Sequence, residues 1–476
     1  MDRCPVDVAR IAHGVPTMQE ADVILVGSGQ AATPLAARLA AAGKNVVLFE
    51  RGELGGTCTN TGCTPTKTMI ASAHAAHVAR TSGRLGVRAA SVAVDLEAVV
   101  ARKDEIVNEW RAGVARHLTS AGERLRVVHE QARFVAERTL EAGGERYRAP
   151  IIVLDVGARP ASPPIRGLSE VPSLDNGSIM RLRQMPDRLV VLGGGYIGCE
   201  MGQMFRRFGS EVVIVESGEH LLGREDADVV EPLQKVFRNE GIELKLGSKA
   251  TEIGKVNGDI VVKVSDGSQV RGSHLLVALG RKPNTDDLGC EAGGVRLDSR
   301  GYIVADEYYA TSAPGVYAVG DVLGGPQFTH TSWDDHRLLF DSLTEPDAPR
   351  RRRSDRIIPY AVFTDPQLAT VGLNEKEARK RGVKYEVATM PFGDVARAIE
   401  VDETAGTMKV LLDPSSEKIL GASLVGAEVG ELLHVFIVLM QAGAKARAIV
   451  DVEFIHPTFA EGLQSLVMRL PQYTLR

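Results

Sequence analysis

The chain has few cysteines, no surplus of basic residues and no long apolar run. Its 476 residues include five cysteines, too few and too odd in number for a secreted disulfide framework. There are 56 Lys and Arg against 61 Asp and Glu, and a net charge of -5 argues against a nucleic-acid-binding surface. No segment approaches the roughly 18 apolar residues that cross a bilayer, and the first twenty residues lack a signal-peptide core. We therefore expect a cytoplasmic protein without nucleic-acid or membrane partners.

The length and the apolar pattern predict an α/β protein of about three domains, at roughly 150 residues each. Residues 21–29 read as a buried strand that enters a glycine turn, followed by a helical segment at 30–42 and a strand at 46–50. The same order returns with a strand at 188–195, a helix through Phe208 and a strand at 211–216. Two such βαβ units predict two doubly wound, Rossmann-like dinucleotide-binding domains with ligand crevices at the carboxyl ends of parallel strands.

The rest of the chain supplies a connecting helix and a third domain. Residues 96–118 have a helical period, residues 125–150 are expected to form strands that return to the first sheet, and residues 315–321 form a further strand. The four arginines at 350–353 are interpreted as a solvated linker. Beyond them, new strands and an apolar helix at 432–442 predict a separate α+β domain.

The first glycine turn has the composition of a dinucleotide-binding fingerprint. Gly27 and Gly29 allow a tight turn and a close approach of backbone N–H groups to a pyrophosphate, while Ala32 stands at the helix–strand contact. Glu50 ends the next strand, where a carboxylate can accept hydrogen bonds from ribose hydroxyls.

The second fingerprint keeps all three glycines, at Gly193, Gly195 and Gly198. Its following strand ends at Glu216, which would repel a 2′-phosphate and therefore favours NADH. His220 and Arg224 lie close enough in the sequence to keep NADPH open. Two dinucleotides are therefore expected.

Between these units, Cys58 and Cys63 are separated by four residues that include Gly62. A glycine bend, with Pro65 suited to an early helical turn, can bring the two sulfurs together as a redox disulfide. A helix N-terminus favours a thiolate, and a disulfide in a reducing compartment is usually catalytic. Zinc is the main chemical alternative, but no second cysteine pair stands nearby, so no metal site is expected. Cys4 is interpreted as a thiol without a function.

Six ordered motifs resemble those of class I pyridine nucleotide–disulfide oxidoreductases, the group of glutathione reductase, lipoamide dehydrogenase and mercuric reductase. The motifs are GGTCTNTGCTPTK, GGGYIGCE, ALGRKPNT, TSAPGVYAVGD, VFTDPQLATVG and IHPTFAE. The resemblance implies a discontinuous FAD domain at 1–155 and 275–349, an NAD(P) domain at 156–274 and a dimerisation domain at 354–476. It also implies a homodimer that uses FAD with NADH or NADPH.

The resemblance further implies roles for individual residues. Cys63 matches the thiolate that faces the flavin, and Cys58 matches the thiol that attacks the substrate. Lys67 and Glu200 match an ion pair beside flavin N5, and Tyr196 matches an aromatic gate over the ring. Asp321 matches the acid that binds the ribityl chain, and His456 with Glu461 matches an acid–base pair that reaches the partner subunit. The remaining matches are further cofactor contacts: Gly56, Thr57, Lys67, Gly157, Thr329 and Gly280.

Two departures bear on the substrate. Asp155 stands where the family usually has alanine, and no physical reason for a carboxylate there is evident from the sequence. Residues 328–336, FTHTSWDDH, resemble instead the mercuric-reductase-like branch that includes the reactive-chlorine-resistance flavoprotein, a copper-reducing enzyme.

The favoured hypothesis is an FAD-dependent NAD(P)H oxidoreductase that passes electrons through Cys58 and Cys63 to a disulfide or related acceptor. Three alternatives stay open. The chain could be a mercuric or cupric ion reductase, a dihydrolipoamide dehydrogenase component of an acyltransferase complex, or a non-enzymatic nucleotide-binding redox sensor.

Overall fold

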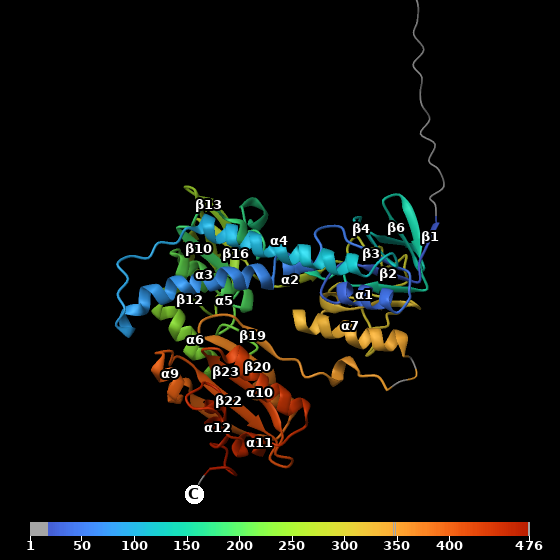
Figure 1. The fold of residues 1–476 in the computed structure, drawn as a ribbon. Helices are drawn as coiled ribbons and strands as arrows, with labels where there is room; N and C mark the ends of the chain where they lie inside the picture. The colour runs from blue at the N-terminus through green and yellow to red at the C-terminus, as the bar shows by residue number, and fades with distance from the viewer. Residues whose placement is uncertain (1–17, 346, 348, 475–476) are drawn as a thin grey trace, which may run out of the picture. The chain divides into compact units, whose positions relative to one another are not determined.

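The structure, a computed structural model, describes residues 18–345, 347 and 349–474, so Cys4 lies outside the described residues. The described chain forms two compact units (Figure 1). The first comprises the described residues up to Gly56, with Val114–Gly157 and Pro283–Arg353. The second comprises Thr57–Gly113 and Ala158–Lys282, with Ser354 and the described residues that follow it.

A five-stranded sheet with parallel pairing forms the centre of the first unit. Its order is β18 (Val316–Ala318), β8 (Ile151–Leu154), β2 (Val23–Val26), β3 (Val46–Phe49) and β4 (Leu125–Val128). Side chains alternate along β2, so Val23 and Leu25 pack in one core cluster with α1 (Ala32–Ala41) and α7 (Thr329–Thr344). The first βαβ unit of the sequence analysis is confirmed.

A second sheet, formed by strands that do not pair with the first, covers the opposite face. Its order is β1 (Met18–Glu20), β7 (Glu145–Arg148), β6 (Thr139–Ala142) and β5 (Arg133–Ala136). The expectation that residues 125–150 return to the first sheet is therefore wrong for all but β4. The physical reason is burial: Tyr147 packs edge-on against Phe49 at 4.9 Å between ring centroids, and this contact covers the face that Ile24 and Val26 present.

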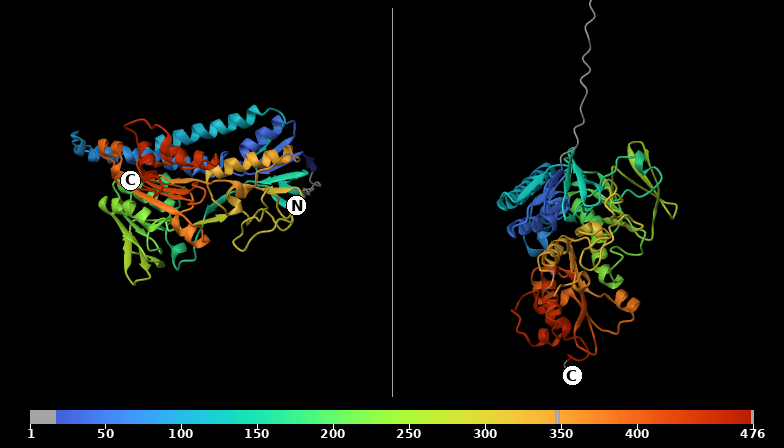
Figure 2. Two further views of the ribbon diagram at one scale, coloured as in Figure 1. Left: turned by 90° about the horizontal axis from the view of Figure 1, so that it is seen from below. Right: turned by 90° about the vertical axis from the view of Figure 1, so that its right-hand side faces the viewer.

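The second unit repeats the arrangement around a parallel sheet of order β12 (Ile242–Lys245), β11 (Glu211–Val215), β10 (Arg188–Leu192) and β16 (His274–Val277). One face packs on helices α5 (Tyr196–Phe208), α6 (Ala227–Asn239), α3 (Cys63–Thr81) and part of α4 (Leu96–Ser120). The other face packs on an antiparallel meander, yellow-green in Figure 2, of β13 (Ala250–Val256), β14 (Asp259–Val264) and β15 (Gln269–Gly272).

The C-terminal part of the second unit is an antiparallel sheet with helices, drawn in orange and red (Figures 1 and 2). The strand order is β19 (Tyr360–Val362), β20 (Gln367–Gly372), β23 (Ile419–Gly426), β22 (Thr407–Leu412) and β21 (Glu386–Pro391). Its helices are α8 (Glu375–Arg381), α9 (Ala396–Glu400), α10 (Val429–Gln441), α11 (Arg447–Asp451) and α12 (Glu461–Val467). This confirms the expected α+β domain.

A pair β9 (Ala158–Pro160) and β17 (Arg281–Pro283), with the short helix α2 (Gly56–Asn60), completes the elements used below. Among the described residues, no helix combines the length and the apolar character that a membrane crossing needs.

Candidate functional site

The first glycine turn joins β2 to α1 with a backbone that only glycine adopts easily. Gly27 has φ +97°, and a β-carbon there would lie 2.2 Å from the carbonyl oxygen of Asp155. Ser28 donates to Glu50 Oε2 from its backbone N–H at 3.0 Å and from its hydroxyl at 2.7 Å. The carboxylate of Glu50, which directly follows β3, therefore holds the turn in place.

The composition of this turn fits the pyrophosphate of a dinucleotide. A β-carbon on Gly56 would lie 2.9 Å from the Cα of Gly29, so two glycine backbones meet where a side chain would fill the space. Ala31, the N-cap of α1, makes no side-chain capping hydrogen bond. Backbone N–H groups at a helix N-terminus are the donors that phosphates bind.

The second glycine turn joins β10 to α5 and is built in the same way. Gly193 has φ +105°, and a β-carbon on Gly198 would lie 1.9 Å from the carbonyl oxygen of Gly193. Gly194 N–H donates to Glu216 Oε2 at 2.6 Å, and Gly218 N–H donates to Oε1 at 2.7 Å. As with Glu50, the carboxylate expected to bind ribose also braces the glycine turn, a role that the sequence analysis missed.

Cys58 and Cys63 lie on consecutive helices of the second unit. Cys58 is half-buried in α2, and Cys63 is the exposed first residue of α3. Gly62 closes the loop between them, because a β-carbon on it would lie 2.8 Å from the carbonyl oxygen of Thr57 and 3.3 Å from the Cα of Cys58. The chain thus folds back on Cys58 just before Cys63, at the N-terminus of a 19-residue helix.

Two polar side chains that no motif pointed to hold this loop. The Arg111 guanidinium donates to Asn60 Oδ1 at 3.0 and 2.9 Å. The Asn176 amide donates to the carbonyl oxygen of Thr61 at 2.6 Å. Both contacts join residues more than 50 positions apart, so no local sequence signal could have found them.

Lys67 and Glu200 form an ion pair, 2.7 Å from Nζ to Oε2, that links α3 to α5. Glu200 is 4% exposed, and its second oxygen accepts from the backbone N–H of Phe363 at 2.8 Å. The Lys67 ammonium also lies 4.7 Å from the centre of the Phe363 ring. The pairing that the family resemblance implied is present, and Phe363 is an additional member.

His456 and Glu461 are also paired, with 2.8 Å between Nδ1 and Oε2. The imidazole is 70% exposed and the carboxylate is 21% exposed. A carboxylate on Nδ1 orients the ring and leaves Nε2 for proton exchange.

The other predicted site residues lie at element ends or in loops. In the first unit, Gly157 has φ +65°, Asp321 lies in the short helix Gly320–Leu323, and Thr329 begins α7. In the second unit, Tyr196 begins α5 and is 38% exposed, Gly280 has φ +114°, and Thr57 lies in α2.

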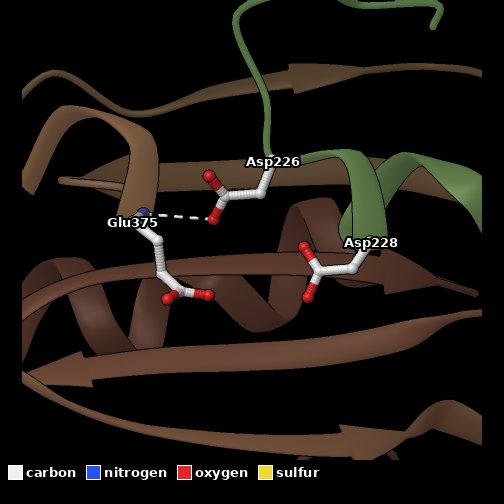
Figure 3. A group of neighbouring side chains, drawn as sticks. All are labelled: Asp226, Asp228 and Glu375. Atoms are coloured by element: carbon white, nitrogen blue, oxygen red, sulfur yellow. Dashed lines mark hydrogen bonds between the residues drawn. The ribbon is translucent and has the colours of Figure 1, made fainter. Parts of the chain in front are cut away.

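A separate acidic cluster of the second unit joins Asp226, Asp228 and Glu375 (Figure 3). The ammonium of Lys409 occupies the centre of this cluster, at 3.3 Å from Asp226, 2.6 Å from Asp228 and 2.8 Å from Glu375. Lysine thus supplies the positive charge that a metal ion would otherwise bring.

Comparison with known proteins identifies two matching family descriptions. Residues 21–335 match "Pyridine nucleotide-disulphide oxidoreductase", and residues 358–467 match the dimerisation domain of the same family.

Individual relatives cover nearly the whole chain. The chain is 33% identical to the probable pyridine nucleotide-disulfide oxidoreductase RclA of Escherichia coli K12, over 94% of this chain and 99% of the relative. It is 32% identical to the mercuric reductase of Bacillus cereus, over 94% of this chain and 71% of the relative. A solved structure described as a Cu(II) complex of the HOCl-induced flavoprotein disulfide reductase RclA matches with a TM-score of 0.86 at 33% identity, covering 94% and 99% of the two chains.

Proposed function

Since this chain belongs to the pyridine nucleotide-disulphide oxidoreductase family and is a flavin-dependent enzyme that uses FAD and NAD(P)H, we propose that it reduces a disulfide or a related acceptor through Cys58 and Cys63. Bound FAD would supply the two-electron chemistry that links NAD(P)H to the disulfide. The protein's own residues bind, orient and protonate the reactants.

The observation that carries this proposal is the loop between the two cysteines. Gly62 lets the chain fold back on Cys58, and Arg111 and Asn176 fix the loop from other segments. Cys63 at the N-terminus of α3 is then the thiol that the helix dipole stabilises as a thiolate. In this reading Cys63 faces the flavin and Cys58 attacks the acceptor.

The nucleotide sites follow from the two braced glycine turns. We assign FAD to Gly27, Gly29, Ala32 and Glu50, with Gly56, Thr57, Lys67, Gly157, Asp321 and Thr329. NADH, in preference to NADPH, is assigned to Gly193, Gly195, Gly198, Glu216 and Gly280. The buried Glu200 fixes Lys67 for contact with the flavin, and Tyr196 is the gate that moves when nicotinamide binds. These residues imply domains at 1–155 with 275–349, at 156–274 and at 354–476.

Reduction of a metal ion is the second candidate, and the Cu(II) complex of the similar structure favours it. A pair of thiolates binds Hg(II), and Cu(I) as the product of Cu(II) reduction, well, because soft sulfur ligands suit such ions. His456 distinguishes the two functions. A disulfide acceptor leaves as a thiolate that needs a proton, whereas a bound metal ion needs none.

We also propose that two copies form the working enzyme, in the cytoplasm. The dimerisation domain supports a homodimer, and Ile455 and His456, 78% and 70% exposed, give a second copy an edge to cover. His456 with Glu461 would then act on the thiols of the partner subunit.

The experiment is anaerobic turnover with NADH or NADPH against small disulfides, Cu(II), Hg(II) and a quinone, for wild type, Cys58→Ser and Cys63→Ser. We expect both variants to lose disulfide reduction and to keep quinone reduction, because hydride transfer into FAD needs no thiol. Wild type that reduces Cu(II) or Hg(II) but no disulfide would replace the first candidate by the second.

A further inference from the structure

Asp155, the carboxylate that the family resemblance left without explanation, lies at the N-terminus of α1. It follows β8, and its backbone N–H donates to the carbonyl oxygen of Val26 on β2 at 2.9 Å. Its Oδ2 accepts from the backbone N–H of Ala32 at 2.8 Å, and the side chain is buried. Because the N-cap Ala31 has no capping side chain, a residue from a neighbouring strand caps the helix.

Two glycines leave the space that this carboxyl group fills, and a third lies against its backbone. A β-carbon on Gly29 would lie 2.7 Å from Asp155 Oδ2, and one on Gly320 would lie 2.8 Å from Oδ1. A β-carbon on Gly27 would lie 2.2 Å from the carbonyl oxygen of the same residue. The carboxyl group is therefore buried against the backbone of the glycine turn.

The charged groups that act on Asp155 most strongly are other acids. Asp321 lies in the short helix Gly320–Leu323 and Asp335 lies in α7; Asp335 accepts from Gly320 N–H at 2.7 Å and from the Tyr309 hydroxyl at 2.8 Å. Burial raises the pKa of Asp155 well above the ordinary range of a carboxyl group. The N–H of Ala32 opposes the rise, and Asp321 and Asp335 add to it.

We propose that Asp155 takes up a proton from solvent when FAD binds, so that the affinity for FAD falls as the pH rises. The inference rests on the proposed position of the FAD pyrophosphate at the Gly27–Gly29 turn. An anion at the N-terminus of α1 would meet a carboxylate already bonded to the same turn, and two anions there repel each other. A proton on the carboxyl group removes the repulsion and leaves its second oxygen as acceptor for Ala32.

The sign and size of the effect follow from linkage. FAD raises the pKa of Asp155 further, so binding is strongest below the pKa of the FAD-free protein. FAD binding then weakens as the pH rises, until the pH passes the higher pKa that Asp155 has in the FAD-bound protein. Between these two values one proton is taken up for each FAD, and the dissociation constant rises tenfold per pH unit.

The test is serial dilution of the full-length holoenzyme between about pH 6 and pH 9.5, with released FAD measured by its fluorescence. The variant is Asp155→Asn, which keeps an oxygen for the Ala32 N–H. The matched control is Asp22→Asn, because Asp22 also accepts a backbone N–H, from Asn45 at 2.7 Å, at the opposite end of β2.

We expect the dissociation constant of wild type and Asp22→Asn to rise at least tenfold over this interval, while Asp155→Asn stays flat and binds FAD more tightly at the alkaline end. Equal slopes in wild type and Asp155→Asn, with one FAD per subunit retained, would overturn the inference and leave the proposed function intact. Protein that binds no FAD at any pH would overturn the proposed function as well.

A second measurement covers the case in which Asp155→Asn fails to fold. The infrared spectrum of the wild-type holoenzyme near pH 7 should contain the carbonyl stretch of a buried, protonated carboxylic acid that shifts on ¹³C labelling of aspartate. Absence of this band would refute the proposal with no variant needed.

Discussion

Replacing Lys409 by methionine should destabilise the second unit strongly, because this lysine is the cation at the centre of three carboxylates. It extends from β22, is 1% exposed, and bonds Asp226 and Asp228 at the start of α6 and Glu375 in α8. Burial lowers the pKa of Lys409, but its hydrogen bonds to Asp228 and Glu375 hold that pKa above the ordinary value. The lysine is therefore charged, and it ties the start of α6 and helix α8 to strand β22 of the C-terminal sheet.

The magnitude follows from burial. Removing one partner of a buried ion pair costs about 3–5 kcal/mol, because the other charge is left without compensation. Asp226 and Glu375 are 8% and 15% exposed, so their charges would be left buried without the lysine ammonium. Asp228 is 60% exposed, and its carboxylate can turn to water. We expect about 3 kcal/mol, the low end of that range, which lowers Tm by about 5 °C for a unit of about 300 residues at about 2.1 cal/mol/K of unfolding entropy per residue.

The deficit should also depend on pH. Burial raises the pKa of Glu375, but Lys409, Tyr385 and Arg379 hold it below the ordinary value of 4.5. In wild type its contribution is therefore present above that value and lost as the pH falls through the folded pKa. In Lys409→Met the hydrogen bond and the charge of Lys409 are lost, while those of Tyr385 and Arg379 remain, so the pKa of Glu375 rises relative to wild type. The carboxyl group then takes up a proton at a higher pH, and the gap in Tm should narrow as the pH is lowered from about 7 toward 5.

The assay is differential scanning calorimetry of the holoenzyme. Lys445→Met is the matched control, because Lys445 pairs with Glu417 at 3.2 Å but is 62% exposed, and such surface pairs contribute at most about 1 kcal/mol. A Lys409→Met Tm within about 2 °C of wild type would refute the reasoning, since the cluster would then need no internal cation.

Three further predictions concern the nucleotide, the acid–base pair and pH. NADH should be the better donor, with a higher kcat/KM than NADPH. Glu216→Gln should reduce this preference for NADH about tenfold, which corresponds to about 1.4 kcal/mol. A wild-type preference for NADPH would contradict the assignment. His456→Ala should slow disulfide turnover by about 10²–10⁴ while stopped-flow flavin reduction is unchanged; an equal loss of Cu(II) reduction would indicate a structural role. The hydrogen bond to Asp365 raises the pKa of His74 above 6.5, so its stabilisation is full below 6.5 and lost as the pH rises through the folded pKa. The fall in Tm between about pH 6 and 8 should therefore be smaller in His74→Gln than in wild type. Equal slopes of Tm against pH in the two proteins would contradict the role given to His74.

The sequence predicted those parts of the fold that local patterns determine. Both glycine turns, with their strands and helices, follow from apolar runs and positive-φ positions that are neighbours in the chain. The strands at 133–148 were misassigned because their sheet is completed by β1, whose Met18 pairs with Arg146. Choice between two sheets depends on which face needs covering, and no local period reports that.

The candidate site shows the same division. Lys67 with Glu200 and His456 with Glu461 could be named in advance because each lies in a recognisable motif. Asp155 had no explanation until its contact with Ala32, 123 residues away in sequence, was visible.

The central claim is that Cys63 faces the flavin and Cys58 attacks the acceptor. The most direct test is an anaerobic titration of the holoenzyme with NADH, in which the long-wavelength absorbance is recorded. If Cys63 is the thiolate that faces the flavin, wild type and Cys58→Ser should develop a thiolate–flavin charge-transfer band, and Cys63→Ser should not. Cys58→Ser should at the same time lose disulfide reduction. A charge-transfer band that survives in Cys63→Ser and disappears in Cys58→Ser would contradict the account.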